Sequence, residues 1–321
     1  MGKEGVDRKG QWPIARVMSK PMSTARDRPM LALGLRLVAT VLFSVMLLLV
    51  KLTGERNIAL PETLFFRQAL PALSIFGWLA ARGQIGRLRT QRPWIHARRA
   101  LIGGTGMFLT LGVVRLLPLA EATILGFTTP IFAVILSALF LKEKVGPWRW
   151  TAVIMGLIGV VVIAGPDTTS LPPFGVAVGI GAAFMVALVT IQVRDLGRTE
   201  EPITVVFYFS AFSAPVLALG LIGQDLGHDA IGWAMLAGIG ISGLFAQIAM
   251  TASLRFGSVS SVIVVDYIQL AWATFWGWLI FNHLPPATTW LGAPIIIGAS
   301  LLIAWREHLL ARARERAPLA A

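Results

Sequence analysis

Two segments place polar side chains inside stretches that are otherwise apolar. One is LLPLAEATILGFTTPIFAVILSALFLKEKVGPWRW, residues 116–150, which contains Glu121, several threonines and Pro130. The other is SVSSVIVVDYIQLAWATFWGWLIF, residues 258–281, which contains Asp266. Inside a lipid-spanning helix each polar group costs free energy unless a partner or a cavity receives it. The two segments therefore predict a polar site at membrane depth.

The second segment carries a carboxylate on a defined helix face. At 100° per residue, Asp266, Gln269, Ala273 and Trp276 lie on one face, which we expect to point inward. Asp266 would then bind an amine or a coupling proton. The alternative is a structural role, as a pair with Arg67 or a hydrogen bond to a neighbouring helix.

Embedded arginines are the complementary charges. Arg67 lies about 10 Å from the end of its apolar run, and its five N–H donors need acceptors there. A substrate carboxylate would serve, as would Glu121 or Asp266. Arg36 is close enough to its helix end to reach the interface, and we expect Glu121 and Arg115 to pair at the outer mouth.

The first segment is interrupted near its middle. Phe127, Thr128 and Pro130 lie about 12 to 17 Å from its outer end, near the bilayer midplane. Pro130 removes one donor and frees the carbonyl of Gly126, so freed backbone and hydroxyl groups would line a cavity. Alternatively, the threonines bond back to their own helix and the proline only kinks it.

Further candidates come from IGGTGMF and its repeat counterpart ISGLFAQIAM. We assign the glycines of IGGTGMF to close helix packing rather than to phosphate binding. The substrate-binding candidates are Asp266, Arg67, Gln269, Trp276, Phe127, Thr128, Tyr267, Gln247, Trp272 and Met107. We expect Pro130 to act as the kink or gate.

Composition shows which elements must position these residues. The chain has 321 residues, of which 56% are hydrophobic and only 14% charged, and its mean hydropathy is +0.74. These values indicate an integral membrane protein. The ten predicted spans are residues 31–51, 59–81, 97–115, 119–141, 149–165, 173–193, 203–223, 230–254, 258–281 and 287–305.

The net charge of +12 at pH 7 reflects basic residues that lie between the apolar runs. They gather on alternate connections and in two basic tails, 1–30 and 306–321, so the positive-inside rule predicts that both termini are cytoplasmic. This pattern argues against nucleic-acid binding. Cysteine is absent and no metal motif occurs, so we expect no metal and no cofactor.

An internal repeat divides the chain into residues 31–165 and 173–305. A shift of 140 positions places Gly103 on Gly243, Arg115 on Arg255, Phe127 on Tyr267 and Trp150 on Trp290. Each copy has five spans, an odd number, so the second copy enters the membrane inverted. Inverted repeats are typical of carriers that work by alternating access.

The residues P-x-x-x-x-x-R from Pro61 to Arg67, then RLLPLAEATILGFTTP and GLIGVVVIAGP, resemble the EamA repeat of the drug/metabolite transporter superfamily. The second half departs from this pattern, because Leu270 corresponds to Pro130 and His283 to Glu143. The resemblance implies a ten-helix carrier in a bacterial inner membrane. The segments LFSVMLLLVK and FFRQALPAL resemble the branch with carriers proposed for S-adenosylmethionine and riboflavin.

The side chains favour a small zwitterion as the transported solute. An amino acid would place its carboxylate on Arg67 and its ammonium on Asp266. The alternative is an aromatic vitamin or nucleoside-like compound, with Phe127, Trp272 and Trp276 as stacking surfaces. An enzyme or a channel is disfavoured, because neither a catalytic constellation nor a filter segment occurs. The expected partners are the solute and the lipid bilayer, with monomer and dimer both open.

Overall fold

The computed structural model describes residues 29–140, 146–164, 171–196, 200–256 and 265–316. All the substrate-binding candidates named above lie within these ranges, in helices or directly beside a helix end. The N-terminal basic tail lies outside them except for its last two residues, and so does Glu143.

The first repeat contains α2 (Pro29–Glu55), α3 (Leu60–Ala81), the short 3-10 helix η1 (Ile85–Leu88), α4 (Pro93–Leu116), α5 (Leu119–Gly126), α6 (Thr129–Phe140) and α7 (Pro147–Ala164). The second repeat contains α8 (Pro173–Leu196), α9 (Pro202–Leu219), α10 (Ala230–Phe256), α12 (Ile268–Phe281) and α13 (Ala287–Arg316). Several helices begin at a proline, whose missing N–H would have no helical partner in the first turn.

Helix length and composition fit a membrane protein. Within the described ranges, seven helical stretches are long and apolar enough to cross a bilayer, with α5 and α6 together forming one of them. Three shorter apolar helices lie in α7, α9 and α12. The protein is therefore an all-α integral membrane protein of ten spans, as the apolar runs predict.

Three of the predicted spans differ most from the observed helices. The span 119–141 is interrupted between Gly126 and Thr129, because Pro130 cannot continue the hydrogen-bond ladder. The last helix does not end at 305 but continues to Arg316. The predicted start of the ninth span, 258–264, lies outside the described residues, and α12 begins at Ile268.

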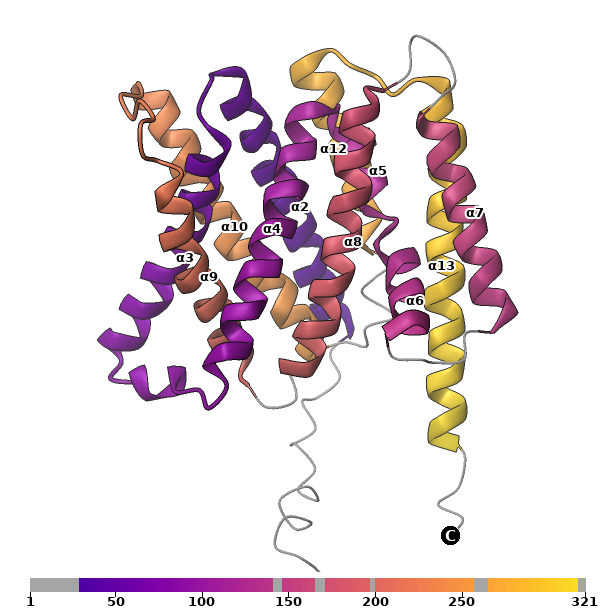
Figure 1. Ribbon diagram of the computed structural model, residues 1–321, viewed down its shortest axis with the longest axis horizontal. Helices are drawn as coiled ribbons and strands as arrows, with labels where there is room; N and C mark the ends of the chain where they lie inside the picture. The colour runs from indigo at the N-terminus through magenta and orange to yellow at the C-terminus, as the bar shows by residue number, and fades with distance from the viewer. Residues whose placement is uncertain (1–28, 141–145, 165–170, 197–199, 257–264, 317–321) are drawn as a thin grey trace, which may run out of the picture.

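Every helix of the first repeat packs against a helix of the second. The main pairs are α2 with α10, α4 with α8, α3 with α9, α5 with α12 and α7 with α13. A shift of one repeat exchanges the first two pairs, as two inverted copies around a pseudo-two-fold axis require. In Figure 1, α7 and α13 stand together at one side of the bundle and α3 and α9 at the other.

The bundle has two ends that differ in what they hold. The start of α2 and the end of α13 lie at the same end, which we name the terminal face, at the bottom of Figure 1. The other end, the opposite face, holds the starts of α3 and α5 and the connections after α9 and α12. The interior between them positions the candidate site.

Candidate functional site

Arg67 lies inside the bundle without a carboxylate partner in the described structure. Its Nε donates to the Sδ of Met46 at 3.3 Å, and its Nη1 donates to the Sδ of Met107 at 2.7 Å. Nη1 also lies 3.4 Å from the Oε1 of Gln68. A thioether is only a weak acceptor. The positive charge of Arg67 is therefore held in place but not neutralised.

Four helices shape the space around this guanidinium. Arg67 comes from α3, Met46 from α2, Met107 from α4, and Gly243 from α10. A methyl group on Gly243 would lie 3.2 Å from the Sδ of Met46 and 3.7 Å from the Cγ of Arg67. The glycine therefore lets α10 approach closely. We name this place the arginine site.

Apolar side chains pack beneath the guanidinium of the arginine site. The buried cluster that includes both methionines is Met46, Val50, Leu64, Met107, Leu111 and Ile239. Two half-buried rings, Phe43 and Phe209, pack against it. Beside it, the Nε2 of buried Gln68 has no hydrogen-bond partner in the described part of the chain. The surroundings combine one charge, an amide, sulfur atoms and aromatic rings.

Asp266 is not the partner of Arg67. Instead, both of its oxygens accept hydrogen bonds from the guanidinium of Arg36 on α2. The side chain of Arg36 is 10% exposed and that of Asp266 is 33% exposed. The structural alternative for Asp266 therefore has a partner, but the partner is the arginine that we expected to reach the interface.

An aromatic group lies near the break between α5 and α6. The rings of Phe127 and Tyr267 meet edge to face, with their centroids 4.9 Å apart. These two residues occupy equivalent positions in the repeats, so they meet where the pseudo-two-fold axis passes. Trp276 donates from Nε1 to the hydroxyl of Ser44 on α2 at 3.2 Å.

Trp272, the other tryptophan candidate, lies one turn before Trp276 on α12. The ring of Trp272 contacts Phe275, which in turn contacts Trp276. The buried Nε1 of Trp272 has no hydrogen-bond partner among the described residues. Gln269 is half-buried in the first turn of α12. Gln247 lies one turn beyond Gly243 on α10 and faces the same direction.

The threonines at the break bond back to their own helix. Thr128 donates to the carbonyl of Leu125 at 2.6 Å, and Thr129 donates to the carbonyl of Gly126 at 2.8 Å. The second bond fills the acceptor that Pro130 leaves free. The carbonyl of Phe127 accepts from Ser300 of α13 at 2.7 Å. The break is thus satisfied by side chains and not by an open cavity wall.

Glu121 and Arg115 do not form the expected pair. Glu121 is fully buried, accepts a hydrogen bond from Thr289 at 3.1 Å, and lies 3.9 Å from the Nε2 of His283. Arg115 instead donates to the carbonyl of Ile58 and to two hydroxyls, at 2.6 to 3.0 Å. The expectation failed because Arg115, near the end of α4, points to the ends of α2 and α3, whereas Glu121, near the start of α5, points to α13.

Arg99 is an interior charge that the sequence pattern missed. The predicted span 97–115 contains Arg99 near its start, but the count of basic residues assigns its charge to the preceding connection. In the structure α4 begins at Pro93, so Arg99 lies six residues inside the helix. Its side chain is buried, and its Nε and Nη1 have no hydrogen-bond partner in the described ranges. The signal was its spacing of four from Gly103 and of eight from Met107, which places all three on one face.

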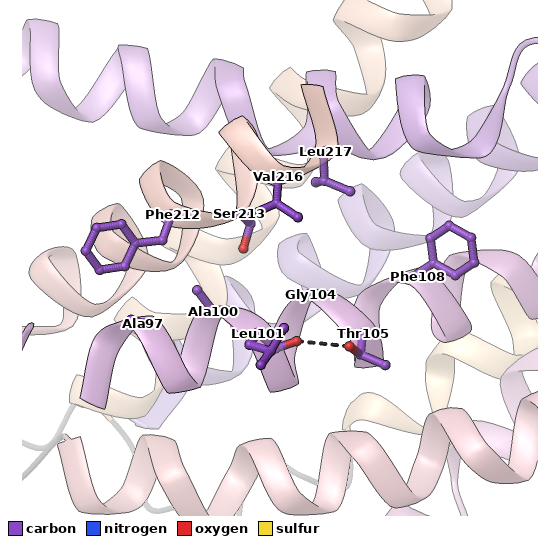
Figure 2. Close-up of a pocket in the computed structure, with 10 residues that line it drawn as sticks. All are labelled: Ala97, Ala100, Leu101, Gly104, Thr105, Phe108, Phe212, Ser213, Val216 and Leu217. Atoms are coloured by element: carbon purple, nitrogen blue, oxygen red, sulfur yellow. Dashed lines mark hydrogen bonds between the residues drawn. The ribbon is translucent and has the colours of Figure 1, made fainter. Parts of the chain in front are cut away.

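A separate groove of about 550 Å³ lies between α4 and α9 (Figure 2). Leu101 and Val216 on its rim are 70% and 63% exposed, so it opens on the flank of the bundle. The hydroxyl of Thr105 donates to the carbonyl of Leu101 at 3.0 Å, the dashed contact in Figure 2. An apolar groove on this flank faces lipid and does not suit a polar solute.

A sequence model of the EamA-like transporter family matches residues 29–165 and 173–305. The chain belongs to the EamA-like transporter family. Both halves are matched, in agreement with the repeat. The family and its relatives are transporters of the drug/metabolite superfamily.

Three named relatives cover most of the chain. A riboflavin transporter of Vibrio cholerae is 32% identical over 255 residues, which are 77% of this chain and 83% of the relative. The Pseudopaline exporter CntI of Pseudomonas aeruginosa is 29% identical over 273 residues, 84% and 94%. An S-adenosylmethionine uptake transporter of Rickettsia felis is 28% identical over 247 residues, 77% and 83%.

The fold is also found among solved structures, including a crystal structure that aligns with most of this chain. It has a TM-score of 0.58 and covers 88% of this chain and 98% of its own length, at 22% identity. At this identity the likeness shows the fold alone. The protein is therefore a transporter of small molecules across a membrane.

Proposed function

We propose that this protein is a secondary carrier that moves a small organic metabolite across the bacterial inner membrane by alternating access, with both ends of the chain in the cytoplasm. The packing of each first-repeat helix on a second-repeat helix supports this proposal, because the two copies can rock against each other. The excess of basic residues on alternate connections supports the orientation.

The solute in this proposal is an aromatic vitamin or nucleoside-like metabolite. The observation that carries it is the arginine site, where the uncompensated charge of Arg67 lies beside the cluster against which Phe43 and Phe209 pack. A ring system could stack there while a polar group binds the guanidinium. Two of the three relatives above are named for riboflavin and S-adenosylmethionine.

An amino acid fits the arrangement less well. Its ammonium would need a carboxylate, and Asp266 already binds Arg36 through both oxygens. The predicted clamp between Arg67 and Asp266 therefore lacks its acidic half unless the Arg36 pair opens. For this reason the vitamin or nucleoside-like class replaces the amino acid as the leading substrate.

In this proposal the break at Phe127 and Thr128 is the moving part. Phe127 and Tyr267 touch across the pseudo-two-fold axis, so the two repeats must separate these rings when the path opens. Pro130 lets α5 and α6 bend relative to each other without breaking a backbone hydrogen bond. Gln247, Gln269, Trp272 and Trp276 stay as lining candidates.

The test is uptake of labelled solutes by proteoliposomes that contain the purified protein. Riboflavin, S-adenosylmethionine and a panel of amino acids are compared. We expect Arg67→Gln to lower transport of the accepted solute at least about ten-fold, because a hydrogen bond to a charged group is worth about 1.5–3 kcal/mol. Arg89→Gln, an exposed loop variant, is the control and should transport normally.

Two results would contradict the proposal. Transport restricted to amino acids would return the substrate to the other class. Full activity of Arg67→Gln at equal membrane expression would remove the arginine site from the pathway.

A further inference from the structure

Arg99 is a second buried cation on the interior face of α4. It lies about 9 Å from the start of this helix at Pro93, on the terminal-face side of the arginine site. Its side chain is packed against the ring of Phe209, with Cζ 4.4 Å from the ring centroid. The residue as a whole is only 9% exposed.

The local packing reserves space for this guanidinium. A methyl group on Gly103 would lie 1.9 Å from the Nη1 of Arg99 and 2.8 Å from the ring of Phe209. Any larger residue than glycine at 103 would displace the arginine. The helix therefore holds the charge against its own axis, where Nε and Nη1 find no hydrogen-bond partner in the described chain.

The carboxylate of Glu200 is engaged elsewhere. It accepts a hydrogen bond from Thr90 at 2.6 Å and lies 3.8 Å from the Nε2 of His96. No ion pair joins it to Arg99, although Arg99 is one turn from His96 on α4. Within the described residues Arg99, like Arg67, has no carboxylate partner.

The two unpaired guanidinium groups belong to one continuous region. Arg99, Gly103 and Met107 follow each other at intervals of four on α4, and Met107 accepts the hydrogen bond from Arg67. Eight residues of helix span about 12 Å. Phe209 connects the two ends, because it lies against Arg99 and also packs on the cluster that contains Met107.

We infer that Arg99 is a second anion-binding station and that the transported solute therefore carries a carboxylate or phosphate group. This inference rests on the proposed function, because only a carrier that opens to the terminal face would present Arg99 to a solute. Two uncompensated cations in a low-dielectric interior are costly, and a solute anion offsets that cost at each station in turn. A cation that already has a structural partner, as Arg36 has in Asp266, would not need a solute anion.

The experiment compares two flavins that differ in one phosphate group. Binding of riboflavin and riboflavin 5′-phosphate to the purified protein in detergent is measured by flavin fluorescence. We expect the phosphate form to bind at least about ten-fold more tightly, and Arg99→Gln to remove most of this preference while leaving riboflavin unchanged. Arg99→Lys should keep part of the preference, and Arg98→Gln, the exposed neighbour, should keep all of it.

A second readout does not depend on flavins. Thermal unfolding is followed with citrate or inorganic phosphate against chloride at equal ionic strength, and a stabilisation that requires Arg99 is expected. Equal behaviour of Arg99→Gln and the unmodified protein in both assays would overturn the inference. If riboflavin were transported without any Arg99-dependent anion effect, the carrier proposal would stand and the second station would fall. Arg99-dependent anion binding without transport of any tested metabolite would keep Arg99 as an anion-binding site and would contradict the carrier proposal.

Discussion

Arg36 and Arg67 are each seven residues inside a helix, but from opposite ends of the bundle. Arg36 binds both oxygens of Asp266, so its charge is neutralised by a residue 230 positions away. Arg67 binds two sulfur atoms and an amide oxygen, so its charge is not neutralised. The same type of side chain thus lies in two environments: Arg36 has a carboxylate partner, and Arg67 has only uncharged acceptors in the described structure.

This difference suggests a structural role for Arg36 and a ligand-binding role for Arg67. A charge whose partner comes from the other repeat stabilises one arrangement of the two copies, because α2 must stay beside the residues just before α12 for the pair to persist. A charge that has only weak acceptors contributes little to that arrangement. Its retention at depth is explained when a ligand supplies the missing acceptor.

The largest expected effect is on stability at the paired arginine. Arg36→Gln leaves the carboxylate of Asp266 without its cation, so we expect the free energy of unfolding to fall by about 1–3 kcal/mol. Arg67→Gln removes an uncompensated charge and should leave the melting temperature in detergent unchanged or higher. The measurement is thermal unfolding of both variants without ligand.

A double variant sharpens this comparison. Asp266→Asn combined with Arg36→Gln replaces both charges by neutral hydrogen-bonding groups, so its loss should be smaller than the sum of the two single losses. If Arg67→Gln unfolded at a lower temperature than Arg36→Gln, the distinction between the two arginines would be wrong.

A smaller effect is expected from a methyl group beside each arginine. Gly243→Ala would crowd Met46 and Arg67, so the affinity for the solute should fall several-fold with little change in unfolding. Gly34→Ala, two residues from Arg36, meets no atom within 4 Å. This control should gain slightly in stability from helix propensity and bind normally. Equal ligand affinity for the two variants would show that solute does not reach Gly243.

The fold followed from the sequence more completely than the site did. Apolar runs and the offset of 140 predict ten spans and two inverted copies, because both patterns can be read directly along the sequence. Partner choice is not local. Nothing on the helix of Asp266 indicates Arg36, and nothing near Glu121 indicates Thr289.

Arg99 shows the same limit at the scale of one turn. A start at residue 97 leaves Arg99 only two residues into its predicted span, whereas Pro93 at the first helical position places it six residues inside α4. Helix ends are where periodicity is weakest, so a charge near an end is easily assigned to the wrong environment.

The smallest effect is expected at the exposed pair of Arg56 and Asp229, which completes the comparison with an ion pair in water. The side chains are 40% and 57% exposed, and their closest atoms are 3.0 Å apart. Asp229 also caps α10, because its Oδ1 accepts the N–H of Gly232 at 2.8 Å. That hydrogen bond, and then the contact with Arg56, lowers the pKa of Asp229 below its ordinary value of 3.8.

Because the pKa is lower in the folded protein, the carboxylate of Asp229 stabilises the fold above the unfolded pKa, and this contribution is lost as pH falls through the folded pKa. Asp229→Asn keeps an oxygen for the cap and removes only the charge. We therefore expect the melting temperatures of the protein and this variant to differ slightly near neutral pH and to converge below about pH 4. The difference should also shrink in high salt, because an exposed pair is screened. A gap that persisted in acid would mean that the charge of Asp229 is not what stabilises the start of α10, and that solvent-exposed pairs here cannot serve as the reference for Arg36 and Arg67.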